Sequence, residues 1–153
     1  MTSSESASRL EDHAGYWLRF VSNHVSQAFA RKVEARGVTV AEWVLLREML
    51  DAGATNPSRL AEALGMTRGT VSKLIERLMH KELVARTVSD QDRRFQSVAL
   101  TPAGTELVPV LARLADENDR EFFGHLNGDE AARLVGLLKE IVRRQGWKDI
   151  PVT

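Results

Sequence analysis

Short polar and basic side chains are concentrated in one stretch of the chain, and these residue types are typical of nucleic-acid contacts. The candidate contacts are Thr67, Arg68, Gly69, Thr70, Ser72, Lys73 and Arg77. Hydroxyl groups and glycine permit close approach to a duplex, while arginine and lysine bind phosphates or guanine edges. A second set follows at Asp92, Arg93 and Arg94, where a carboxylate can hold a neighbouring guanidinium by paired hydrogen bonds. Both sets predict a negatively charged partner.

The charge distribution supports this interpretation. The 153-residue chain has 21 basic and 21 acidic residues, so its formal net charge is zero. The window from Arg68 to Arg94, however, holds seven basic and four acidic residues and therefore a net charge of +3. A local basic surface on a neutral protein favours a specific DNA contact over non-specific coating. A merely solvated helix face is the competing explanation.

The elements that must position these side chains form a predicted helix-turn-helix over residues 57–78. Asn56 caps the first helix and Pro57 starts it. Ala61 is small enough for two helices to cross, and Gly65 tolerates the positive φ of the turn. The second helix buries an apolar face made by Val71, Leu74, Ile75 and Leu78. An ordinary antiparallel helix pair is the alternative.

Strand-forming residues on either side of a polar loop predict a β-hairpin directly after the helix-turn-helix. The expected strands are Val84–Ser89 and Gln96–Leu100, with Asp92, Arg93 and Arg94 in the loop between them. In a winged helix such a loop reaches the narrow minor groove, whose negative potential attracts arginine. A solvated polar turn is the alternative here.

The run from Ser58 to Gly104 resembles the multiple antibiotic resistance regulator (MarR) family of winged-helix proteins. The matching motifs are RLAEALGMTRGTVSKLIERL, LVAR at 83–86, DRR at 92–94 and LTPAG at 100–104. The resemblance implies a homodimer that binds a pseudo-palindromic operator, with binding often modulated by a small molecule. It also implies that Arg68–Arg77 lies in the major groove and that Asp92 and Arg94 form a pair in the wing.

Glu82 departs from the family pattern, which usually has glycine after the recognition helix. Glutamate is unfavourable in the left-handed conformation of a helix C-terminal cap. We therefore expect the helix to end differently at this point, with a consequence for the placement of the hairpin.

The element order, four helices, two strands and two further helices, predicts a mainly α fold with a small antiparallel β-hairpin wing. The first helix is expected from Arg9 to near Gly37, and later helices start at the Thr39–Glu42 capping box, Thr101-Pro102 and Asn127. The expected organisation is a flexible tail, an N-terminal dimerisation helix, a winged helix-turn-helix lobe and C-terminal dimerisation helices, over residues 1–8, 9–37, 38–101 and 102–153.

The first and the last two predicted helices carry more apolar surface than a lobe of roughly 65 residues can bury. An isologous two-fold interface between two copies of the chain would cover that surface. A larger monomeric core is the alternative. The apolar positions thus predict a homodimer.

An aromatic cluster near the lobe predicts a small-molecule pocket. Its members are Trp17, Phe20, His24, Trp43 and Arg47. An aromatic cleft with one basic group suits a planar aromatic anion such as a phenolic carboxylate. The alternative, that the aromatic residues are simply core, is the commoner situation for any one of them.

Other classes of function find little support in the residues. The chain has no cysteine, and none of its four histidines is paired at helical spacing, so we expect no metal site and no cofactor. No membrane span, signal pattern or catalytic motif is evident, so we expect a cytoplasmic protein that is not an enzyme. The predicted function is a dimeric transcriptional repressor with a small aromatic ligand as its expected releasing agent, and the alternative is an architectural DNA-binding protein.

Overall fold

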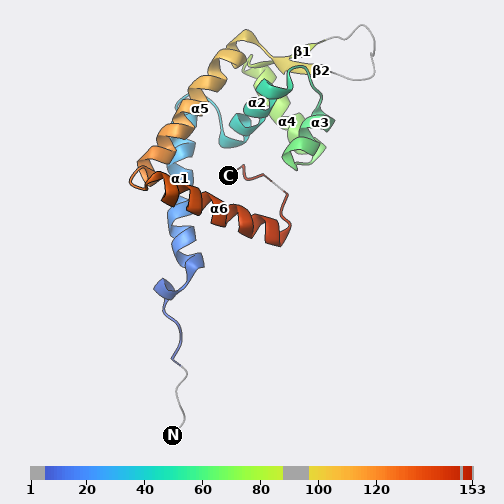
Figure 1. The fold of residues 1–153 in the computed structure, drawn as a ribbon. Helices are drawn as coiled ribbons and strands as arrows, with labels where there is room; N and C mark the ends of the chain where they lie inside the picture. The colour runs from blue at the N-terminus through green and yellow to red at the C-terminus, as the bar shows by residue number, and fades with distance from the viewer. Residues whose placement is uncertain (1–5, 88–96, 149, 153) are drawn as a thin grey trace.

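The computed structural model describes residues 6–87, 97–148 and 150–152. A long N-terminal helix lies beside a long fifth helix, and a compact lobe of three helices and a hairpin is attached at one end of this pair (Figure 1). The elements are α1 (Ala14–Glu34), α2 (Val40–Ala52), α3 (Pro57–Leu64), α4 (Arg68–His80), β1 (Val84–Thr87), β2 (Ser97–Leu100), α5 (Pro102–Phe123) and α6 (Gly128–Gln145). The predicted fold class, mainly α with a small antiparallel hairpin, is confirmed.

Side-chain caps fix most of the helix starts where the sequence predicts them. In each case an oxygen of the capping side chain accepts a hydrogen bond from the backbone N–H three residues later, which satisfies a donor that the helix itself leaves free. The capping residues are Thr39, Asn56, Thr67, Thr101 and Asn127. These local signals place α2 to α6 along the chain.

The first helix differs from its predicted extent. The Arg9 backbone N–H donates to Asp12 Oδ2 at 2.9 Å and closes a separate 3₁₀ turn, η1 (Leu10–Asp12). His13 then adopts an extended conformation, so α1 begins only at Ala14. At the other end α1 stops at Glu34, and the left-handed Gly37 lies in the turn beyond it. The local hydrogen bond between Arg9 and Asp12 therefore overrides the helical periodicity at the start.

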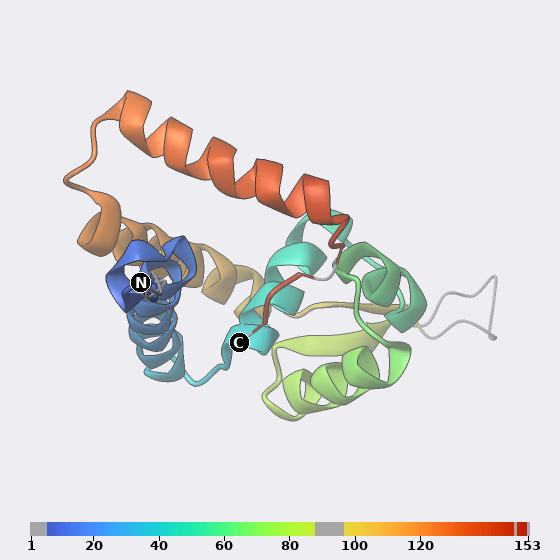
Figure 2. The ribbon, with the colours of Figure 1, turned by 90° about the horizontal axis from the view of Figure 1, so that it is seen from below.

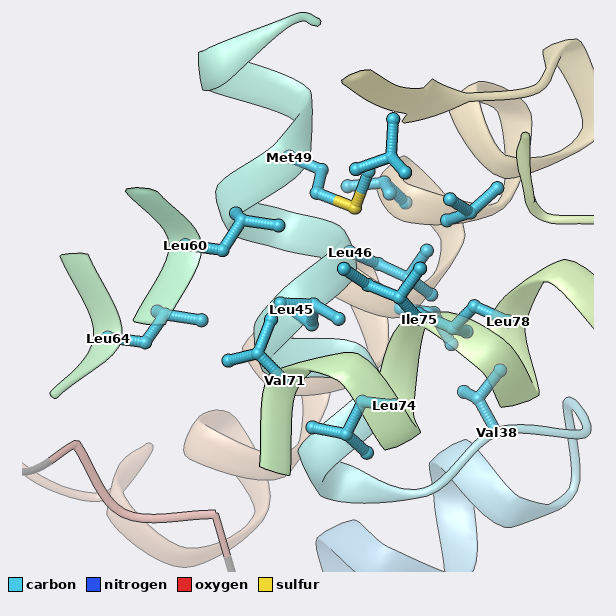
Figure 3. Close-up of a cluster of buried hydrophobic side chains, with 14 of the residues drawn as sticks. Val38, Leu45, Leu46, Met49, Leu60, Leu64, Val71, Leu74, Ile75 and Leu78 are labelled. Atoms are coloured by element: carbon cyan, nitrogen blue, oxygen red, sulfur yellow. The ribbon is translucent and has the colours of Figure 1, made fainter. Parts of the chain in front are cut away.

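The core of the lobe is formed by apolar side chains from α2, α3 and α4 and from the turn before α2, which point toward one another (Figure 3). Its labelled members are Val38, Leu45, Leu46, Met49, Leu60, Leu64, Val71, Leu74, Ile75 and Leu78. Val98 of β2 and Val108 and Leu111 of α5 extend the same cluster, so the hairpin and α5 are packed onto the helix-turn-helix. Burial on this scale fixes the orientation of α4 within the lobe.

The hairpin has a third participant that the sequence does not predict. β1 and β2 pair antiparallel, with Val84 opposite Leu100. On the other side of β2, Thr55 and Val98 exchange backbone hydrogen bonds of 2.9 and 2.7 Å. The short segment 53–56 between α2 and α3 therefore ties the hairpin to the start of α3. Residues 88–96, which include the predicted strand ends, lie outside the described part.

Glu82 adopts the left-handed conformation, with φ of 62°, despite being an unfavourable residue for it. The Glu82 N–H donates to the Met79 carbonyl at 3.0 Å, and the Leu83 N–H donates to the Leu78 carbonyl at 2.9 Å. These are the two hydrogen bonds of a Schellman motif. The expectation that α4 would end differently without glycine is therefore wrong, because the two bonds and the burial of Leu78 hold the left-handed cap.

The last helix stands apart from the rest of the protomer. α6 runs from the end of α5 back toward the lobe without packing into the core, and none of its residues is buried (Figure 2). Beyond it the Ile150 N–H reaches the Leu64 carbonyl at the end of α3, at 3.5 Å. Within the described ranges no helix is both long enough and apolar enough to cross a lipid bilayer.

Candidate nucleic-acid interface

The recognition helix α4 has two chemically distinct faces. Val71, Leu74, Ile75 and Leu78 are buried in the lobe core, as the spacing predicts. The opposite face is exposed and carries hydroxyl, glycine and basic residues. Its predicted contact residues are Arg68, Gly69, Thr70, Ser72, Lys73 and Arg77. One helix thus presents all of them on a surface that the core holds rigidly.

The N-terminal end of α4 is arranged for close approach. Thr67 Oγ1 accepts the Thr70 backbone N–H at 3.2 Å and lies 2.8 Å from the Thr70 hydroxyl. Nothing among the described residues lies within 4 Å of where a β-carbon on Gly69 would stand. Packing therefore does not require glycine here, whereas a phosphate held at a helix N-terminus gains from an unobstructed backbone.

The turn between α3 and α4 fixes how the two helices cross. Gly65 is left-handed, with φ 64° and ψ 26°, and ends α3. The Met66 N–H donates to the Ala61 carbonyl at 3.0 Å, and Ala61 itself is buried at the crossing. The predicted roles of Ala61 and Gly65 are confirmed, and they hold α4 in the orientation that exposes its polar face.

The exposed face of α4 continues onto the base of the hairpin. A cavity of about 210 Å³ lies between them, lined in part by Ser72 and Glu76 of α4 and by Arg86 of β1. Arg86 is exposed and extends the basic surface beyond the helix. Asp92, Arg93 and Arg94, the predicted wing residues, lie outside the described residues.

The five residues of the predicted ligand pocket lie on different surfaces of the described protomer. Trp17, Phe20 and His24 share an exposed face of α1, where the rings of Phe20 and His24 stack 5.4 Å apart. Arg47 lies on the outside of α2 and pairs with Asp51 at 3.0 Å. A cleft common to all five residues stays a prediction, because helical spacing groups residues on one face without saying which neighbour that face meets.

Trp43 does line a cavity, of about 310 Å³, between α1, α2 and α5. The other lining residues are Val25, Ser26, Phe29, Val40, Val44, Ala115, Asn118, Asp119 and Pro151. Sequence reasoning missed Asn118, which is only 3% exposed. Its amide donates to the Val25 carbonyl at 3.1 Å and its oxygen accepts from Lys32 Nζ at 2.8 Å. Asn118 lies within a helix, and the residues near it in the sequence do not indicate that it binds Val25 and Lys32 of another helix.

Glu42 was expected only as part of a helix cap, yet it is completely buried. Burial raises the pKa of a carboxyl group, but hydrogen bonds from Lys81 and from Thr39 outweigh it and hold the pKa of Glu42 below its ordinary value. Glu42 is therefore a buried carboxylate with a fixed cationic partner. Elsewhere, the described ranges contain no group of three or more potential metal-ligating side chains.

Comparison with known proteins agrees with the fold and the motifs. A helix-turn-helix followed by a hairpin defines a winged-helix protein. The sequence pattern of the MarR family matches residues 36–94. A putative transcriptional regulatory protein for the hcr operon of Thauera aromatica is 28% identical over 131 residues, which cover 85% of this chain and 79% of that protein.

Solved structures give the same assignment over most of the chain. BpsR of Bordetella bronchiseptica, described by its regulation of DNA binding by 6-hydroxynicotinic acid, is 29% identical with a TM-score of 0.74, covering 89% of this chain and 97% of its own. MepR of Staphylococcus aureus in complex with DNA is 26% identical with a TM-score of 0.73, covering 86% and 98%. These matches support a winged-helix transcriptional regulator of the MarR type, a class of DNA-binding protein and not of enzyme.

Proposed function

We propose that this protein is a dimeric repressor that binds a pseudo-palindromic operator with one α4 in each major groove. The observation that carries the proposal is the division of α4 into a buried apolar face and an exposed polar and basic face. The proposed contacts are Thr67, Arg68, Gly69, Thr70, Ser72, Lys73 and Arg77. Lysine and arginine would neutralise phosphates, while Ser72 and Thr70 are short enough to approach base edges.

The exposed apolar surface of the protomer supports the dimer. Large apolar side chains on α6 are uncovered, among them Leu137, which is 62% exposed, and Ile141, which is 47% exposed. On α1, Trp17 and Phe20 are 51% and 52% exposed. Apolar patches of this kind on a monomer are typical of an interface, and a second copy of the chain covers both helices by a two-fold operation.

The wing residues are proposed from the sequence and the family pattern. Arg94 would enter the minor groove, with Asp92 holding its guanidinium and Arg93 on the adjacent phosphate. Arg94→Ala is expected to weaken operator binding while leaving the unfolding transition unchanged. Equal affinity of the variant and the wild type at matched salt concentration would remove the wing from the proposal.

The cavity beside Trp43 is the proposed effector site. Phe29 and Trp43 form an edge-to-face pair with ring centroids 6.4 Å apart, which offers a planar ligand an aromatic wall. None of its described lining residues is basic, and Asp119 is acidic. A small aromatic ligand of phenolic type without a carboxylate therefore fits this cavity better than the expected aromatic anion.

Repression follows from steric occlusion, since a dimer that spans two half-sites covers promoter DNA that a polymerase needs. Because the relatives are bacterial, the cytoplasm is the proposed location. Selection of bound sequences from random DNA tests the function directly. Enrichment of two inverted half-sites at one fixed separation is expected. Binding without sequence preference would instead establish an architectural DNA-binding protein.

A further inference from the structure

Lys81 connects the end of the recognition helix to a distant part of the chain. It is the C-terminal cap residue of α4. Its Nζ donates to the Gly37 carbonyl at 2.9 Å and to Glu42 Oε1 at 2.9 Å, and it also lies 2.9 Å from Glu42 Oε2. Gly37 belongs to the turn that follows α1. The Lys81 ammonium group thus links the recognition helix α4 to the turn after α1, the helix that carries the exposed aromatic face.

The Glu42 carboxylate, which binds the Lys81 ammonium, is itself held in a fixed position. Its Oε1 also accepts the Thr39 backbone N–H at 3.0 Å, and its own N–H donates to Thr39 Oγ1 at 3.1 Å. The carboxylate has no solvent exposure, whereas the Lys81 side chain is 38% exposed. A buried carboxylate that is anchored by a capping box cannot follow Lys81 if α4 shifts, so the pair resists such a shift.

We propose that Lys81 and Glu42 are positioning residues for operator recognition, which hold the C-terminal end of α4 against the α1–α2 turn and so set the separation of the two recognition helices in the dimer. This inference rests on the proposed dimeric function. The Lys81 ammonium is bound to Glu42 and to the Gly37 carbonyl, so the effect of the pair acts through the orientation of α4.

The geometry of DNA makes that orientation measurable. Each base pair added between half-sites displaces the second half-site by about 3.4 Å and turns it by about 35°. A dimer with rigidly held recognition helices therefore accepts one spacing and rejects its neighbours. A dimer whose α4 can tilt at its C-terminal end loses less affinity at a wrong spacing, and it also gains less affinity at the right one.

The experiment measures binding to duplexes that carry the two half-sites at the selected spacing and at one and two base pairs more or less. The main variant is the double substitution Glu42→Gln with Lys81→Met, which removes both charges and leaves no unpaired buried carboxylate. Gln retains an oxygen for the Thr39 N–H. Glu42→Gln alone is the second variant, because it keeps the capping box and leaves Lys81 free to turn to solvent.

The wild type is expected to prefer one spacing by about tenfold or more, and the variants are expected to reduce that preference severalfold while a single half-site is bound equally well. The matched control is Arg47→Met with Asp51→Asn, which removes the exposed ion pair of α2 and should leave the profile unchanged. An unchanged profile in folded, dimeric variants would overturn the positioning role. A wild type without any preferred spacing would overturn the proposed function itself.

Discussion

Gly104, in the first turn of α5, lies directly against the carbonyl oxygen of Leu83 at the start of the hairpin. A β-carbon on residue 104 would overlap that oxygen and would also press on the Leu100 side chain at 3.3 Å. The same Leu83 carbonyl accepts the Thr101 N–H at 3.0 Å, and the Thr101 hydroxyl donates to the Glu82 carbonyl at 2.7 Å. The LTPAG motif at residues 100–104 is therefore the place where the end of the recognition helix, the hairpin and α5 are packed and hydrogen-bonded together.

Gly104→Ala is expected to destabilise the protein by about 1–3 kcal/mol, because the new β-carbon overlaps the Leu83 backbone. That backbone cannot move without disrupting the hydrogen bonds that Thr101 makes there. Urea unfolding measures the effect. Gly128→Ala is the matched control, since no described atom lies within 4 Å of its missing β-carbon and α6 begins there. A loss in the control as large as that at Gly104 would contradict the steric explanation.

Glu82→Gly is expected to raise the free energy of unfolding, by up to about 1 kcal/mol. Glycine removes the strain of the left-handed φ, although its greater freedom in the unfolded chain offsets part of the gain. Glu82→Ala keeps the β-carbon and should change stability little. If alanine stabilised the protein as much as glycine, the side chain of Glu82 rather than its φ would be responsible.

Acid is expected to remove the contribution of the Glu42–Lys81 pair. Because the pKa of Glu42 is lowered on folding, its carboxylate stabilises the folded state above the ordinary value of 4.5, and that contribution is lost as pH falls through the lower folded value. The stability difference between the wild type and Glu42→Gln should therefore shrink as pH falls below about 4.5. Urea titrations from neutral to acidic pH give that difference, and a constant difference would contradict the linkage.

Lys73→Ala is expected to weaken operator binding and to lower the slope of log affinity against log salt by about one, since one phosphate contact is lost. Lys73 is exposed on the outer face of α4, so the fold should be unaffected. Arg113→Ala removes an exposed cation from α5 and serves as the control. Equal salt slopes for the two variants would show that Lys73 does not contact a phosphate.

The features that sequence predicts well here are those that depend on near neighbours. Thr101 and Asn127 cap their helices because the bonded N–H groups are three residues away, and the buried face of α4 follows from helical periodicity. Glu82 was identified as unusual from its position, but whether its cap would form depended on the packing of Leu78, which sequence alone does not supply.

The features that sequence misses involve partners far along the chain. Lys81 and Glu42 are 39 residues apart, and Lys32 and Asn118 are 86 residues apart. In each pair, the sequence around one residue gives no indication of its partner, because the pairing depends on how whole helices pack. The predicted ligand cluster depends on such packing too: Trp17 and Phe20 share a face of α1, and that face is exposed in this protomer.

The backbone pairing of Thr55 with Val98 also bears on self-association. A two-stranded hairpin offers two open edges, to which an extended segment of another molecule can add. At Val98 the edge of β2 is already occupied by the chain's own Thr55, while β1 occupies the other side. Truncating the 53–56 loop would reopen that edge and promote strand-mediated aggregation, even though no apolar residue of the core is changed.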